Sequence, residues 1–189
     1  MKIGIDIDEV ITETNAEFTN FYNIRTGSSL AMCDFYTYTL SEVLKCTKEE
    51  ARRIFDEFYN SAHFDNISPV EGSIGSIKKL LKEHEIYLIT ARPLSYKQKT
   101  ERWFKTYLPE IKNSIIYPGK AKTKAEVCKR LGIELIIEDN IKYSLECITA
   151  GLKVILPTKP WNRYLIDNDI IRVNSWIEIL GHIKQLSTF

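Results

Sequence analysis

The sequence predicts an α/β protein with a parallel β-sheet between two layers of helices, and with a helical insertion after the first strand. Over residues 69–189, short apolar runs alternate regularly with segments of helical periodicity. Such alternation implies parallel strands, right-handed crossovers and three layers. Residues 12–68 break this alternation, because they are helical and rich in aromatic side chains. We therefore expect a core formed by residues 1–11 and 69–189, and a separate helical unit at 12–68.

The first strand is predicted at residues 2–10, where isoleucines alternate with glycine and two carboxylates. Alternate residues of a strand share a face, so Asp6 and Asp8 are expected to lie together. Two such carboxylates repel each other unless a cation lies beside them, and Mg²⁺ prefers a few oxygen ligands plus a substrate phosphate. An alternative is that the aspartate pair only ends the strand and caps the next segment.

Residues 12–68 are expected to contain two main helices. The first begins at Thr14 or Asn15 and ends near Gly27, and the second begins after a capping-box pattern formed by Thr47 and Glu50. The apolar stripe of the second helix is expected to form core. The loop between the helices contains three aromatic residues that are better candidates for ligand contact: Phe35, Tyr36 and Tyr38.

The remaining elements follow in a regular order. Helices are expected at about 74–81, 95–108, 123–131, 141–150 and 176–180, and strands at 86–89, 114–117, 134–137 and 153–156. Gly132 is expected to end the third of these helices.

Composition narrows the class of partner. With 26 basic and 25 acidic residues, the net charge of +1 favours neither a nucleic-acid polymer nor an anionic membrane. No apolar run approaches the ~20 residues that span a bilayer, and the first residues enter a strand without a signal-peptide pattern. We expect a cytoplasmic protein. The four cysteines show no metal-ligand spacing, and the sequence carries no indication of oligomeric state.

Polar residues follow the predicted strands at four places: Asp6 and Asp8, Thr90, a lysine cluster, and the pair Glu138 and Asp139. In an open parallel sheet, ligands bind outside the carboxyl ends of the strands. Carboxylates, a hydroxyl group and a lysine that converge there suit phosphoryl transfer. One aspartate can attack phosphorus, and a second, two residues on, can protonate the leaving oxygen.

These residues resemble the motifs of the haloacid dehalogenase (HAD) superfamily. Asp6-Ile7-Asp8-Glu9-Val10 matches the DxDx(T/V) motif, Leu88-Ile89-Thr90 the second motif, and Ile136-Ile137-Glu138-Asp139 the acidic motif. The chain looks most like the 5′(3′)-deoxyribonucleotidase-like phosphatases, which carry a small helical cap directly after the first motif. The resemblance implies a Rossmann-like HAD core with residues 12–68 as the cap.

The resemblance also implies roles for individual residues. Asp6 would be the nucleophile and an Mg²⁺ ligand, and Asp8 the general acid/base and a second ligand through its backbone carbonyl. Asp139 would be the distal Mg²⁺ ligand, with Glu138 in support, and Thr90 would bind the phosphoryl group. Two residues depart from the common pattern, because Glu9 stands where many relatives carry glycine and Glu138 replaces an aspartate.

The third motif is a lysine, for which Lys124 is favoured and Lys120 and Lys122 remain alternatives. Ala91 and Arg92 follow Thr90 and are expected at the substrate, where an arginine can hold a phosphate or carboxylate bidentately. Arg92 could equally pair with an acid of the insertion. Trp161 and Asn162 either border the mouth of the site or serve in packing.

The predicted function is that of an Mg²⁺-dependent phosphomonoesterase, a hydrolase acting on a small phosphorylated metabolite through an aspartyl-phosphate on Asp6. A (deoxy)nucleoside 5′-monophosphate is the favoured substrate, because aromatic residues of the insertion can stack a base. Sugar phosphates and other small phosphate esters remain alternatives. A non-catalytic regulatory domain that binds Mg²⁺ and phosphate is the alternative from another class.

Overall fold

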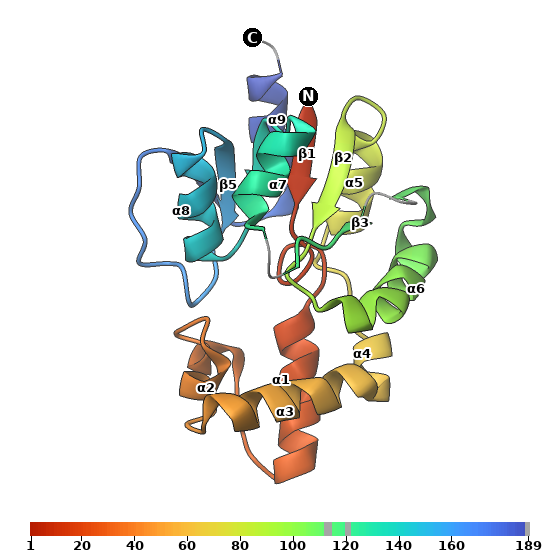
Figure 1. Cartoon of the computed structure of the whole chain (residues 1–189), viewed down its shortest axis with the longest axis vertical. Coiled ribbons are helices and arrows are strands. Elements are labelled where there is room, and N and C mark those ends of the chain that lie inside the picture. The colour runs from red at the N-terminus through yellow and green to blue at the C-terminus, as the bar shows by residue number, and fades with distance from the viewer. Residues whose placement is uncertain (112–114, 120–121, 188–189) are drawn as a thin grey trace.

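The computed structural model describes residues 1–111, 115–119 and 122–187. Figure 1 shows two parts, an α/β part that contains both termini and a helical part attached at one end of the sheet. The chain leaves β1 to form the helical part and returns to the α/β part at α5. The sequence prediction of an α/β fold with an insertion after the first strand is confirmed.

The sheet has six strands in the order β3-β2-β1-β4-β5-β6, and every neighbouring pair is parallel. The strands are β1 (Lys2–Ile5), β2 (Glu85–Ile89), β3 (Ile115–Ile116), β4 (Leu135–Ile137), β5 (Lys153–Pro157) and β6 (Ile170–Val173). The order of strands reverses between β1 and β4, because β1 connects towards β2 and β4 towards β5. A ligand crevice is expected at the carboxyl ends of these two central strands.

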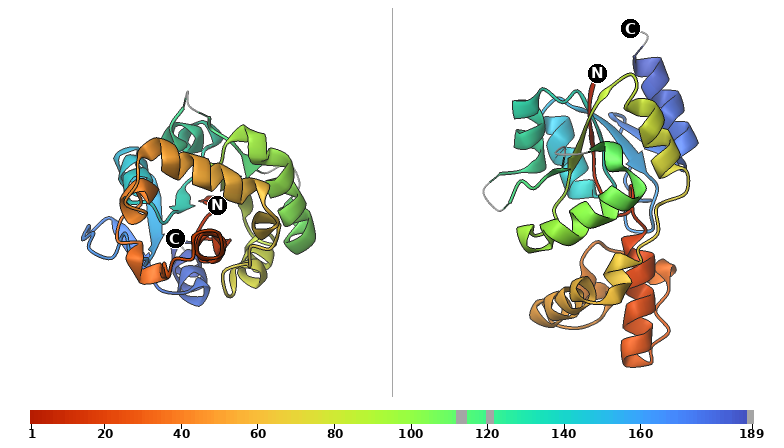
Figure 2. Two further views of the ribbon diagram at one scale, coloured as in Figure 1. Left: turned by 90° about the horizontal axis from the view of Figure 1, so that it is seen from below. Right: turned by 90° about the vertical axis from the view of Figure 1, so that its right-hand side faces the viewer.

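Helices cover both faces of the sheet (Figure 2). One apolar cluster joins β1, β2 and β4 to α5 (Ser73–Leu80), α6 (Lys97–Tyr107) and α9 (Trp176–Leu186). A second cluster, on the opposite face, joins the sheet to α7 (Lys124–Leu131) and α8 (Ile141–Thr149). Short 3₁₀ helices lie at η2 (Leu94–Tyr96) and η3 (Pro109–Ile111). Burial of both faces explains why the central strands are almost wholly apolar.

The helical insertion contains α1 (Thr14–Thr26), η1 (Met32–Asp34), α2 (Leu40–Val43), α3 (Lys48–Asn60) and α4 (Ala62–Asp65). It has its own aromatic core, in which Phe18 packs edge-on against Phe58 at 5.5 Å between ring centroids. The two connecting segments run side by side: Val70 N–H donates to the Ile11 carbonyl at 2.8 Å, and Glu13 N–H donates to the Ser68 carbonyl at 2.9 Å. The boundaries 12–68 remain a prediction for the extent of a separate domain.

Two details of the predicted strands differ. The strand expected at residues 2–10 ends at Ile5, so the expectation that Asp6 and Asp8 share a strand face is wrong. The chain turns there instead, because the Ile11 and Thr12 amides both donate to the Ile7 carbonyl. The edge strand β6 was not predicted. Ser114, at the start of one predicted strand, lies outside the described residues.

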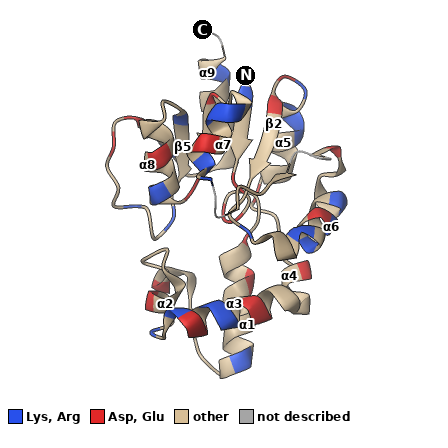
Figure 3. Ribbon diagram, in the orientation of Figure 1, with Lys and Arg blue, Asp and Glu red and all other residues tan. Residues whose placement is uncertain are grey.

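Basic and acidic residues are both found in the α/β part and in the helical part in the view of Figure 3. Over the described ranges, none of the helices combines the length and apolar character needed to cross a membrane.

Candidate active site

A buried lysine links the ends of the two central strands. The Lys124 ammonium donates to Asp6 Oδ1 and to Glu138 Oε2, each at 2.6 Å. All three side chains are buried. Lys124 is the first residue of α7. The Thr123 side chain caps this helix, and the Thr123 amide donates to the Glu126 carboxylate. The capping box therefore fixes the position from which the lysine reaches the carboxylates.

Of the three candidate lysines, Lys124 is the one that the structure places between these carboxylates. Lys122 is exposed on the loop that precedes α7. Lys120 lies outside the described residues.

Asp139 adds a third carboxylate to this group. Ligand oxygens of Asp6, Glu138 and Asp139 all lie within 4.8 Å of one another. The Trp161 indole N–H donates to Asp139 Oδ2 at 2.9 Å, whereas Asp139 Oδ1 is buried and has no partner in the described part of the chain. An unpartnered, buried carboxylate oxygen beside two further carboxylates suits a hard divalent cation. The residues present therefore fit such an ion.

The electrostatics of this group also favour a cation. Burial, followed by the neighbouring Glu138 carboxylate, raises the pKa of Asp6 to about 7. The same two causes raise the pKa of Asp139 well above its usual value. Burial alone would lower the pKa of Lys124, but the charges of Asp6 and Glu138 outweigh it and raise that pKa. One lysine thus only partly balances three carboxylates.

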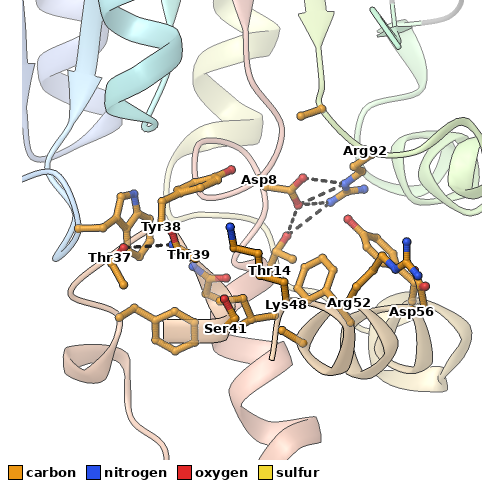
Figure 4. A pocket seen from close by; sticks show the side chains of 18 of the residues that line it. Asp8, Thr14, Thr37, Tyr38, Thr39, Ser41, Lys48, Arg52, Asp56 and Arg92 are labelled. Atoms are coloured by element: carbon orange, nitrogen blue, oxygen red, sulfur yellow. Dashed lines mark hydrogen bonds and ion pairs between the residues drawn. The ribbon is translucent and has the colours of Figure 1, made fainter. Parts of the chain in front are cut away.

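Asp8 lies on the other side of the turn and is held by Arg92 (Figure 4). Arg92 Nε donates to Asp8 Oδ2 at 3.0 Å and Nη2 donates to Oδ1 at 2.7 Å, while Nη1 donates to Thr100 at 3.2 Å. Burial alone would raise the pKa of Asp8, but the charge and hydrogen bonds of Arg92 outweigh it, so the pKa is lowered. The partner of Arg92 in the structure is thus an acid of the core, which was not predicted, and not an acid of the insertion.

The structure gives a reason for the glutamate at position 9, where many relatives carry glycine. Its backbone is in the left-handed region, with φ of 61°, a conformation that costs a non-glycine residue about 1–2 kcal/mol. Its carboxylate accepts the Asn15 amide at 2.6 Å and lies 3.9 Å from the Lys159 ammonium. The side chain thus ties the start of α1 to the core, which offsets the backbone strain. Burial raises the pKa of Glu9 to about 7.

Thr90 follows β2 and is completely buried. Its hydroxyl oxygen accepts the Arg92 amide at 3.1 Å, and the hydroxyl proton remains to be donated. Asn162 donates to the Asp139 carbonyl at 2.8 Å, so both Trp161 and Asn162 support the acidic motif directly.

A pocket of about 420 Å³ lies between the core and the insertion (Figure 4). Asp8, Ala91 and Arg92 line its core side. Of the loop aromatics that were predicted to contact a ligand, Phe35 and Tyr38 line this pocket, but Tyr36 does not. The prediction that the apolar stripe of α3 forms core is confirmed, since four of its five members are buried and the half-buried Phe55 packs against them: Ala51, Ile54, Phe58 and Tyr59. Three members of the stripe also line the pocket: Ala51, Phe55 and Tyr59.

The family model described as 5′ nucleotidase, deoxy (pyrimidine), cytosolic type C protein matches residues 1–186. The chain belongs to this family. The nucleotidase is therefore a HAD-type phosphatase, which confirms the resemblance drawn from its motifs.

Individual relatives agree with this assignment. The nucleotidase is 28% identical over 182 residues to the 5′(3′)-deoxyribonucleotidase of Bacillus subtilis, covering 94% of this chain and 95% of the relative. It is 26% identical over 187 residues to a nucleotidase of Clostridium acetobutylicum, covering 98% and 95%.

Solved structures support the fold. A haloacid dehalogenase-like hydrolase from Streptococcus pneumoniae superposes with a TM-score of 0.71 at 16% identity, over 96% of this chain and 97% of the other. A HAD family hydrolase from Deinococcus radiodurans, solved with bound phosphate and sodium, gives a TM-score of 0.72 at 13% identity, over 98% and 96%. The nucleotidase thus has the HAD-like fold.

Proposed function

We propose that this nucleotidase is an Mg²⁺-dependent phosphomonoesterase that hydrolyses a (deoxy)nucleoside 5′-monophosphate through an aspartyl-phosphate on Asp6. The observation that carries the proposal is the meeting of Asp6, Lys124, Glu138 and Asp139 at the ends of β1 and β4. A cytoplasmic location stays a prediction.

In this proposal a carboxylate oxygen of Asp6 attacks the phosphorus atom, and the bond from phosphorus to the ester oxygen breaks. Asp8 passes a proton to the leaving oxygen, the proton coming from the monoanionic phosphate ester. In the second half, Asp8 accepts a proton from the water that attacks phosphorus and releases Asp6. Its lowered pKa suits this second role, because Asp8 is ionised at neutral pH.

The other residues bind and orient the phosphoryl group. Lys124 lies against Asp6 and balances negative charge, and Thr90 donates its hydroxyl proton to a phosphoryl oxygen. Ala91 and Arg92 contact the substrate from the pocket wall while the Arg92 guanidinium holds Asp8. Residues 12–68 act as the cap over this site.

The metal ion would be held by Asp6, Asp139 and the backbone carbonyl of Asp8, with Glu138 retained on Lys124. When bound, Mg²⁺ neutralises the charge of the nucleophile and of the phosphoryl oxygens. Glu138 supports this division of roles, because both of its oxygens are already occupied: Oε2 by Lys124 and Oε1 by the Asn140 amide at 3.0 Å.

Phosphate release from a panel of nucleoside monophosphates and sugar phosphates, with Mg²⁺ and with EDTA, tests the proposal. We expect metal-dependent release and the highest kcat/KM for a deoxynucleoside 5′-monophosphate. A higher kcat/KM for sugar phosphates would overturn the substrate class. Mg²⁺ binding without release from any ester would indicate a regulatory domain instead.

The stability of the metal-free protein is expected to fall as pH rises from about 5 to about 8. The pKa values of Asp6 and of Glu9 are both about 7 in the folded state and are lower in the unfolded state, so the folded state binds more protons between these values. The resulting contribution to the free energy of unfolding is fully present below the pKa that these carboxyl groups have in the unfolded state. It is lost as pH rises through 7. Asp8 has a lowered pKa, so its contribution to stability is lost as pH falls. That loss takes place below its ordinary pKa and therefore outside the range of pH 5 to 8.

Thermal unfolding of the EDTA-treated protein measures this effect. We expect the Tm to fall by several degrees, since one pKa unit corresponds to about 1.4 kcal/mol. Saturating Mg²⁺ at about pH 8 should restore the Tm. A metal-free Tm that rises over this pH range would contradict the raised pKa of Asp6.

Replacing Trp161 with phenylalanine is expected to weaken Mg²⁺ binding about tenfold, because Asp139 loses the N–H that orients it. The shift of Tm during Mg²⁺ titration measures the affinity. Trp103→Phe is a matched control, since Trp103 is also buried but donates to the Ile67 carbonyl. Equal Mg²⁺ affinities in the two variants would show that Trp161 does not support metal binding.

A further inference from the structure

Two cationic side chains of α3, Lys48 and Arg52, line the pocket on the side of the insertion. Figure 4 shows both extending from the helix into the pocket, towards the end at which Asp8 and Arg92 lie. Neither side chain has a hydrogen-bond or ion-pair partner within the described ranges. The adjacent Arg53, which does not line the pocket, lies 3.8 Å from the Glu57 carboxylate.

The pocket wall carries one more cation than carboxylates. Arg92 is bonded to Asp8, which leaves Asp56 as the one lining carboxylate to set against Lys48 and Arg52. The hydroxyl of Tyr96, which donates to Asp56 at 2.8 Å, is neutral and does not change this balance. Lys48 and Arg52 are four residues apart on one face of α3, a spacing at which like charges repel. An anion in the pocket would relieve this repulsion.

The reacting phosphoryl group does not account for these cations. Lys124 and Thr90 lie at the strand ends and are not among the residues that line the pocket, and the same holds for the carboxylates of the proposed Mg²⁺ site. A neutral base and sugar would need aromatic contact, which Phe55 and Tyr59 supply from the same helix, but no cation. The pocket volume of about 420 Å³ is in the range of small-molecule sites.

We propose that Lys48 and Arg52 form a second anion subsite, so that the preferred substrate carries a second phosphate or carboxylate group besides the phosphoryl group that is removed. This inference rests on the proposed function. Two cations on one helix face hold such a group through charge-assisted hydrogen bonds. The insertion then selects substrates by charge as well as by stacking.

Matched substrates test this inference. The kcat/KM for a deoxynucleoside 5′-monophosphate is compared with that for the 3′,5′-bisphosphate of the same nucleoside. It is also compared with that for a nucleoside 5′-monophosphate whose base carries a carboxylate. We expect at least one doubly anionic substrate to be preferred about tenfold, and the preference to fall with added salt. The two arms distinguish a phosphate from a carboxylate.

Variants assign the preference to the two side chains. Lys48→Ala and Arg52→Ala are each expected to remove most of it, while kcat/KM for the monophosphate changes less than about twofold. Both residues are exposed at the surface of α3, so the fold should be unaffected. Arg53→Ala, a loss of the same charge one residue away, is the matched control and should retain the preference.

Three results would overturn the inference. Equal kcat/KM for all three substrates overturns it and leaves the proposed function intact. A Lys48→Ala variant that loses activity equally on all substrates would place Lys48 at the reacting phosphoryl group instead. No hydrolysis of any ester, including a simple aryl phosphate, overturns the proposed function and this inference together.

Discussion

Replacing Asp6 with asparagine is expected to lower kcat at least about 10⁴-fold, because an amide cannot attack phosphorus. The amide oxygen can still accept the hydrogen bond from Lys124, which in the protein spans 2.6 Å. The fold should therefore be retained. Since the pKa of Asp6 is about 7, the substitution also removes a buried charge at higher pH, and the metal-free Tm at about pH 8 should rise.

Single-turnover phosphate release and thermal unfolding measure these two effects. Asp169→Asn is the matched control, since Asp169 is exposed and directly precedes β6, at the end of that strand opposite to its carboxyl end. Its activity and Tm should equal those of the unmodified protein. Retention of more than about a hundredth of the activity in Asp6→Asn would argue against Asp6 as the nucleophile.

Replacing Lys124 with methionine is expected to reduce both stability and activity. The ammonium group is buried between Asp6 and Glu138, so its loss leaves two carboxylates without their cation. Breaking a buried ion pair in this way costs about 3–5 kcal/mol. The loss of stability should be larger at about pH 8 than at about pH 5, because Asp6 is protonated at the lower pH.

Urea unfolding of Lys124→Met at the two pH values measures this cost. The double variant with Glu138→Gln should regain part of the stability, since one of the unpaired charges is removed, but it should not regain activity. Lys122→Met is the matched control, because Lys122 is exposed and lies two residues before the first residue of the helix. If Lys122→Met were the inactive variant, the assignment of the third motif would be wrong.

The convergence of the motifs was predictable from the sequence because it depends on one rule. Asp6, Thr90 and Asp139 each follow an apolar strand, and parallel strands bring their carboxyl ends to the same edge. Lys124 could be favoured over Lys120 and Lys122 because it begins the helix that precedes β4, but the sequence left the choice among the three open. These features are local in sequence, so local patterns sufficed.

The partner of Arg92 was not predictable, because Asp8 lies 84 residues away and side-chain pairing across that separation leaves no periodic signal. The same holds for Trp161, which reaches Asp139 from a loop 22 residues further on. The early end of β1 depends on the turn at Ile7–Thr12, whose bonds are made by backbone atoms. The position of Lys48 and Arg52 at the pocket was not predictable either, because it depends on how the insertion packs against the core.

The side-by-side connections between core and insertion have a consequence for how such proteins diversify. Because the Ile11 carbonyl is bonded to the Val70 amide, a replacement segment has to close only a short gap, and closure entropy grows slowly with its length. The insertion between these two connections is encoded by one continuous stretch of the gene, so recombination can replace it as a single segment. New recognition surfaces can arise in this way without moving the carboxylates and lysine at the strand ends.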